Sequence, residues 1–103
     1  MIPVNDSSLR RPLIVAVDSK ETDLAVVDKE LTKRYGEDYY IHAIADPNVA
    51  LTLLEETESP VAMVLADPWM APLSGPDFLM RVRDAFPEAK IHFAFNEDYV
   101  WKT

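Results

Sequence analysis

Two aspartates directly follow apolar runs of the sequence, at positions where a carboxylate can do chemistry. Asp18 follows Leu13–Val17, and Asp67 follows Val61–Ala66. An aspartate at the end of a buried strand can cap the next turn, supply an oxygen ligand to a cation, or act as a nucleophile toward a phosphate ester. Because ligands of parallel sheets bind at the carboxyl ends of the strands, both aspartates are candidate site residues.

The other residue types that carry chemistry are less well placed. His42 and His92 lie within predicted strands and lack the spacing of metal ligands, so we interpret them as packed or partly exposed strand residues. The chain has no cysteine, which excludes disulfides and thiolate metal sites. Its two glycines form no phosphate-binding loop, which argues against a flavodoxin-like cofactor carrier. A hydrolase using Asp67 is disfavoured as well, because no second acid follows two residues later.

The elements that position the two aspartates must be strands alternating with helices. The run Leu13–Val17 predicts a strand that is covered on both faces. The next segment has apolar residues at helical spacing, at positions 24, 27, 31 and 35. Ser19 or Thr22 can cap the start of this helix, and Gly36 suits its end.

The strand and helix pattern then repeats twice and ends on a further strand. The predicted elements are a strand over 39–45, a helix from Asp46-Pro47 to Ser59-Pro60, a strand over Val61–Ala66, a helix capped by Ser74 and Asp77 and closed by Pro87, and a strand over 91–95. This alternation predicts an α/β fold, a doubly wound parallel sheet built from βα repeats with helices on both faces.

The two ends of the chain are expected to differ from this core. Residues 1–12 are predicted to be a flexible arm, and 13–103 one domain. Only about eight residues follow the fourth strand, so the last βα unit of such a repeat is missing. The segment 99–103 can return as an antiparallel edge strand, fray, or exchange with a second chain. The uncovered edge favours a homodimer through the fourth strand and the C-terminal segment.

Composition limits the class of partner. The 103 residues, 49% of them apolar, are enough for one compact core. Eighteen acidic and ten basic side chains give a formal charge of −8, which argues against binding to nucleic acid or to an anionic membrane surface. The longest apolar runs are strand-sized, and the N-terminus lacks the apolar core of a signal peptide, so a cytoplasmic location is expected.

The spacing around the second aspartate resembles that of response-regulator receiver domains, which have a flavodoxin-like fold. This family carries an acidic pair after its first strand and an acceptor aspartate after its third, with methionine three, proline four and glycine eight positions later. Asp67, Met70 and Gly75 match the pattern, Ala71 replaces the proline, and the likeness covers roughly residues 12 to 96. The segments 11–18, 34–36 and 85–90 also resemble receivers that precede thioredoxin-reductase-like flavoenzyme domains.

The resemblance implies phosphoryl transfer to Asp67 from a histidine kinase or a small phosphodonor. It also implies a Mg²⁺ ion held by Asp18, Asp67 and the backbone carbonyl of Trp69. The plainer alternatives are that each aspartate caps a turn and that the Trp69 ring covers the core.

Several positions depart from the receiver pattern. Ser19 stands where the family has its second acid, and a neutral hydroxyl is a poor ligand for a hard cation. Ala94 or Phe95 stands where a hydroxyl residue normally responds to phosphorylation, and neither can donate a hydrogen bond. The lysine at the end of the family's fifth strand falls in the part that this chain lacks. Pro68 removes a backbone N–H beside the acceptor. Ser19 thus predicts weak Mg²⁺ binding, and the other departures argue against efficient phosphorylation of Asp67.

The sequence therefore favours an atypical receiver, a signalling module that works by binding protein and not as an enzyme. Its partner is then a second copy or an output protein, and Asp67 is a weak or vestigial phosphoacceptor. The alternative is a conventional phospho-receiver of a two-component system. In that case a partner chain, or sequence beyond these 103 residues, supplies the missing segment.

Overall fold

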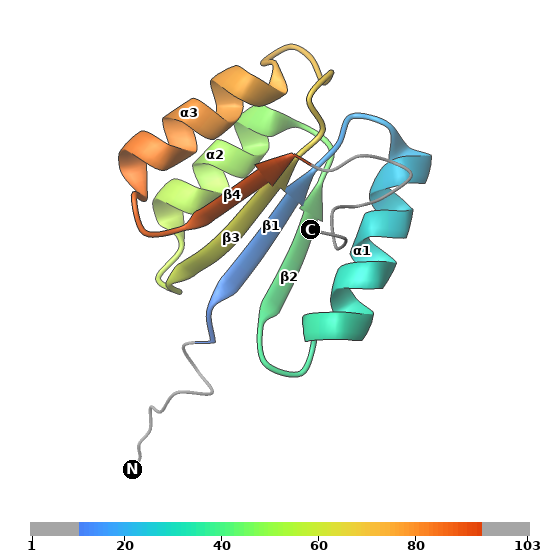
Figure 1. Cartoon of the computed structure of the whole chain (residues 1–103), viewed down its shortest axis with the longest axis vertical. Coiled ribbons are helices and arrows are strands. Elements are labelled where there is room, and N and C mark those ends of the chain that lie inside the picture. The colour runs from blue at the N-terminus through green and yellow to red at the C-terminus, as the bar shows by residue number, and fades with distance from the viewer. Residues whose placement is uncertain (1–10, 94–103) are drawn as a thin grey trace.

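The computed structural model describes residues 11–93, which form a four-stranded parallel sheet with three helices (Figure 1). Along the chain the elements are β1 (Leu13–Val17), α1 (Glu21–Tyr35), β2 (Tyr40–Ile44), α2 (Pro47–Glu56), β3 (Val61–Ala66), α3 (Gly75–Ala85) and β4 (Lys90–Phe93). The strand order is β2-β1-β3-β4. The predicted α/β fold with a doubly wound parallel sheet is confirmed.

The core lies on both faces of β1, all five residues of which are buried. Figure 1 shows α1 on one face of the sheet and α2 with α3 on the other. The larger cluster joins alternate residues of β1 and β3 to α2 and α3, with Phe78 fully buried in it. The smaller cluster packs the opposite side of the same strands against Val27 and Leu31 of α1. An apolar strand buried on both faces is what the unbroken apolar run predicted.

Element boundaries follow the sequence pattern closely, with one shortened helix. β1 and β3 have the predicted bounds, and β2 is one residue shorter at each end than predicted. The helix predicted to reach Ser59-Pro60 ends at Glu56, because Thr57 has an extended backbone and its hydroxyl accepts the N–H of Ser59. Within residues 11–93 no helix is both long and apolar enough to cross a bilayer.

The starts of the helices show which predicted caps form. Asp46 caps α2 by accepting the N–H of Asn48 at 2.8 Å, and Ser74 caps α3 by accepting the N–H of Asp77 at 3.3 Å. The predicted cap of α1 by Ser19 or Thr22 is wrong. Lys20 occupies the N-cap position and makes no side-chain cap, because its ammonium group has no acceptor for a backbone N–H.

The last described strand is β4, at the edge of the sheet. β4 begins at Lys90, one residue earlier than predicted. The remainder of that predicted strand, Ala94 and Phe95, lies outside the described residues, as do the segment 96–103 and residues 1–10. From the predicted N-terminal arm, Arg11 stacks over the Tyr40 ring with 5.5 Å between the guanidinium carbon and the ring centroid.

Replacing Asp46 with alanine should lower the free energy of unfolding by about 1 kcal/mol, because the Asn48 N–H loses its side-chain acceptor at the start of α2. Chemical denaturation monitored by circular dichroism measures this change. Glu55→Ala, at an exposed position of the same helix, is the control and should stay within about 0.5 kcal/mol of the parent. Equal losses in the two variants would show that the cap adds nothing.

Candidate functional site

The pairing of β1 with β3 brings the two candidate aspartates together. Val17 lies opposite Ala66, and the N–H of Asp67 donates to the Val17 carbonyl at 3.0 Å. Asp18 and Asp67 therefore leave neighbouring parallel strands at the same level of the carboxyl edge. The N–H of Asp18 in turn donates to the carbonyl of Ile44 at 3.3 Å, which ties this edge to β2.

An irregularity in the sheet sets this level. Leu13 pairs with Val61, but Ile14 pairs with Met63, so β3 contains one extra residue at this point. Counted straight from the first pair, Ser19 and not Asp18 would lie opposite Asp67. The bulge therefore aligns the two carboxylates, and it also lets Met63 face the side of the sheet opposite to Val61.

Each carboxylate also holds its own turn. One oxygen of Asp18 accepts the N–H of Lys20 at 2.9 Å, and one oxygen of Asp67 accepts the N–H of Trp69 at 3.2 Å. Capping and ligand binding are therefore compatible, because each carboxylate has a second oxygen that makes no hydrogen bond within residues 11–93. Both candidate aspartates keep acceptor capacity at the same edge.

Asp18 is the buried acid of this pair. Its residue is only 4% exposed, whereas Asp67 is half-buried. Burial raises the pKa of Asp18 above its usual value, and the nearby charges of Asp67 and Asp23 raise it further. The hydrogen bond from the Lys20 N–H and the Lys20 ammonium act in the opposite direction. Two neighbouring carboxylates that disfavour each other's charge form a site where a cation or a proton would relieve repulsion.

Gly75 explains sterically why a glycine stands eight residues after Asp67. A β-carbon added there would lie 2.5 Å from the Asp67 carbonyl oxygen and 2.6 Å from the Pro68 α-carbon. The N–H of Gly75 also donates to the Pro68 carbonyl at 3.4 Å. The first residue of α3 thus packs directly on the backbone that carries Asp67. Met70, between them, is buried in the larger core cluster and anchors the loop.

The Trp69 ring does not cover the core, contrary to one of the two interpretations of this residue. Trp69 is 83% exposed, so that interpretation is wrong. The core at this point is already closed by Met70. The remaining interpretation of Trp69 is that its backbone carbonyl could be a metal ligand.

The residues at this edge fit a weak Mg²⁺ site better than a strong one. Asp18 and Asp67 supply two hard oxygen ligands, and Ser19, where a third acid would help, is exposed and neutral. In the part of the chain that the structure describes, no three acidic or histidine side chains gather as a metal-binding group. His42 and His92 are exposed on β2 and β4 and take no part in the site. The predicted switch positions, Ala94 and Phe95, lie outside the described residues.

Asp23 is the site residue that sequence reasoning missed. It lies in the first turn of α1, close enough for its charge to raise the pKa of Asp18. Its signal was its position, five residues after Asp18 at the start of the predicted helix. A carboxylate there also interacts favourably with the positive end of the helix dipole, so Asp23 stabilises α1 while it adds negative charge to the site.

Comparison with known proteins gave matches among solved structures alone. No family model matches the chain, and no curated protein matches it. An uncharacterized protein from Neptuniibacter caesariensis has a TM-score of 0.66 and 29% identity, over 78% of this chain and 56% of that chain. The signal receiver domain of an HD domain-containing protein from Pseudomonas fluorescens Pf-5 has a TM-score of 0.65 and 29% identity, over 82% and 63%.

A third match is a chain in the complex of the histidine kinase ThkA with the response regulator protein TrrA. It has a TM-score of 0.63 and 23% identity, over 80% of this chain and 66% of that chain. The present chain thus spans between 56% and 66% of the length of these three structures.

Asp18 should titrate with a pKa above that of an ordinary aspartate. Asp67→Asn should lower the pKa of Asp18, because the substitution removes a neighbouring negative charge. Nuclear magnetic resonance of the carboxyl carbon measures both values. Because the folded-state pKa is raised, the stability contributed by protonated Asp18 is complete below the usual aspartate pKa and is lost as the pH rises through the folded value. Asp18→Asn should therefore stabilise the fold at neutral pH but not in acid. An unchanged Asp18 titration in Asp67→Asn would contradict this electrostatic coupling.

Substitution of Gly75 by alanine should lower the free energy of unfolding by roughly 1–3 kcal/mol, since the added carbon meets backbone atoms that cannot rotate away. Thermal and urea unfolding give the magnitude. The loss of stability would come from steric overlap and not from backbone strain, because no described glycine has a positive φ angle. Pro76→Ala, at the exposed neighbouring position, serves as control and should change stability by less than about 1 kcal/mol.

Proposed function

We propose that this chain, which has the fold of signal receiver domains, is an atypical receiver that acts by binding protein, with Asp67 as a weak or vestigial phosphoacceptor. The observation that carries the proposal is the pair of carboxylates, Asp18 and Asp67, at one edge of the sheet, with the neutral Ser19 directly after Asp18 and no metal-binding group of three acidic or histidine side chains among residues 11–93. The acceptor position is kept, and the groups that would make phosphorylation efficient are sparse.

The chemistry open to this site is transfer of a phosphoryl group to Asp67. A carboxylate oxygen would attack phosphorus, an acyl phosphate would form, and the donor's leaving group would depart with the electron pair of its bond to phosphorus. Asp18, Asp67 and the Trp69 carbonyl are the groups that would hold Mg²⁺, whose charge would offset that of the incoming phosphate. With Ser19 in place of an acid, the affinity for Mg²⁺ is low, and so is the phosphorylated fraction.

The proposed partners are a histidine kinase or an output protein, together with a second copy of the chain at the β4 edge. One structural neighbour belongs to a complex of a histidine kinase with a response regulator, which supports a kinase as a candidate partner class. The module would act in the cytoplasm, as a binding protein and not as an enzyme with turnover. Among the described strands β4 is at one edge of the sheet, beside β3, and an edge strand is the element through which two sheets can pair.

A conventional phospho-receiver is the second candidate. It is favoured by the close contact of Gly75 with Asp67 and by the burial of Met70, which keep the acceptor loop in a defined conformation. In that case the missing last segment, with its lysine, would come from a partner chain or from sequence outside these 103 residues.

Incubation with acetyl phosphate and Mg²⁺ should leave most of the wild-type chain unphosphorylated on a Phos-tag gel. Ser19→Asp, which restores an acid at an exposed position, should raise the phosphorylated fraction several-fold, and adding Asp67→Asn to that variant should abolish it. Stoichiometric phosphorylation of the wild type that depends on Asp67 would overturn the atypical assignment and support the conventional receiver.

A further inference from the structure

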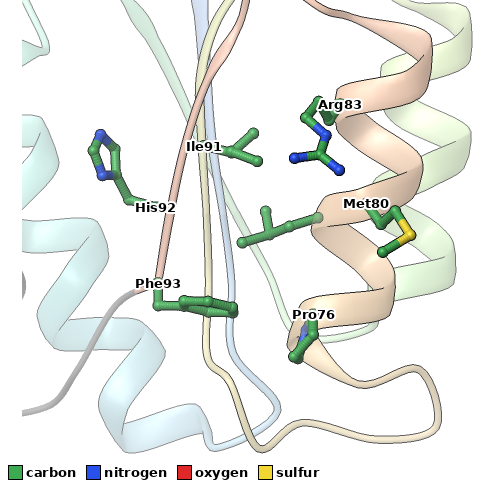
Figure 2. A pocket seen from close by; sticks show the side chains of 7 residues that line it. Pro76, Met80, Arg83, Ile91, His92 and Phe93 are labelled. Atoms are coloured by element: carbon green, nitrogen blue, oxygen red, sulfur yellow. The ribbon is translucent and has the colours of Figure 1, made fainter.

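An open groove runs between α3 and β4, at the edge of the sheet. Its volume is about 400 Å³, and its lining is mostly apolar: Pro76, Leu79, Met80, Arg83, Ile91, His92 and Phe93. Figure 2 shows Ile91 and Phe93 pointing from β4 toward α3, whereas His92 points to the other side of the sheet. The lining residues of α3 are spaced as one helical stripe, and Met80 on it is 52% exposed.

We propose that the occupant of this groove is a second copy of the chain, related by a two-fold axis perpendicular to the sheet. In this dimer β4 pairs antiparallel with β4 of the second copy, and the two α3 helices lie side by side, each closing the groove of the other. The inference rests on the proposed function, in which the chain acts through its β4 edge, and it names the partner and the contacts.

The spacing of the elements supports this arrangement. Helix α3 packs on both β3 and β4, so its axis lies over the space between them. Neighbouring strands are about 4.8 Å apart, and an added β4 would place the second α3 two strand spacings away, at about 10 Å. Packed helices lie about 8–10 Å apart. Strand pairing and helix packing are therefore satisfied by the same displacement, with no space for a further layer between the helices.

The positions along α3 also match under the two-fold operation. Helix α3 runs antiparallel to β4, and Figure 2 shows Pro76 beside Phe93 and Arg83 beside Ile91. The centre of the stripe, near Met80, is thus level with His92. An axis at this level pairs Ile91 with Phe93 of the second copy on the groove side and places the two Met80 side chains next to each other. A symmetric interface requires this self-complementarity.

Charge favours this edge over the rest of the surface. The chain carries −8 overall, so two copies repel each other across most approaches. From Pro76 to Phe93 the three basic residues Arg81, Arg83 and Lys90 balance the three acids Asp77, Asp84 and Glu88, so this edge is formally neutral. Across the axis at Met80, Arg83 is level with Asp77 of the second copy, and both are exposed. The long Arg83 side chain can bury its stem in the groove and direct its guanidinium to that carboxylate at the solvent side.

Cysteine cross-linking tests the geometry directly, because the chain has no cysteine of its own. Met80→Cys should give a covalent dimer with a short bismaleimide, and Val49→Cys should remain monomeric. Val49 is the matched control, an apolar helical residue that is 53% exposed but lies on α2 away from β4. Equal cross-linking of the two variants would overturn the proposal.

Sedimentation of the full chain gives the second readout. The wild type should be dimeric at about 100 μM, a concentration suited to weak association. Arg83→Glu should raise the dissociation constant about tenfold or more, and Arg83→Glu with Asp77→Arg should recover most of the loss, as expected for a direct charge pair. A monomeric wild type overturns the dimer. It does so also if hydrogen exchange shows the β4 amides protected in the monomer, as they would be if residues 94–103 covered the edge. It leaves the proposed role of Asp67 as a weak phosphoacceptor standing, since that role fails only on the phosphorylation assay.

Discussion

The parallel pairing of β1 with β3 is the constraint on which the rest of this molecule depends. Both strands contribute buried side chains to the two core clusters, so the sheet cannot shift without exposing apolar surface. The same pairing ends with Val17 opposite Ala66, which places Asp18 beside Asp67. Hydrophobic packing therefore determines the separation of two carboxylates that would otherwise repel each other. The site is positioned by its scaffold and not by attraction among its own groups.

In this arrangement the Asp18 carboxylate lies where burial and neighbouring negative charges disfavour its ionised form. Asp18 is nearly buried and close to two other carboxylates, and one backbone hydrogen bond only partly compensates. A cation would relieve this repulsion, which is why the residues suit Mg²⁺ even though Ser19 adds no charge. The edge itself is held by the burial of β1 and by the larger core cluster.

Much of the fold could be predicted from the sequence, because the strongest signals are local. Two apolar runs with no polar residue are β1 and β3 with the predicted bounds, and Asp46-Pro47 opens α2 as its cap chemistry requires. The N-cap of α1 was missed because the helix begins at Glu21, which puts Lys20, a residue without a side-chain acceptor, at the cap position.

The rest depends on three-dimensional relations that leave little trace in a single sequence. The extra residue of β3 lies between Val61 and Met63 and brings Asp18 opposite Asp67. The strand contains no glycine or proline that would indicate a bulge there. The direction of the Trp69 ring depends on whether another side chain has filled the core, and Met70 has done so. The proximity of Asp23 to Asp18 follows from how α1 packs on β1, which a pattern of apolar spacing cannot locate to within a side chain.

The tight contact at Gly75 has a consequence for how this domain could transmit information. Gly75 touches the backbone of Asp67 and Pro68, and the next residue, Pro76, begins the stripe that lines the groove beside β4. Two surfaces with different chemistry, one acidic and one apolar, thus meet within a single peptide unit of α3. Because this contact is tight, the backbone that carries Asp67 and the first turn of α3 cannot approach each other any further.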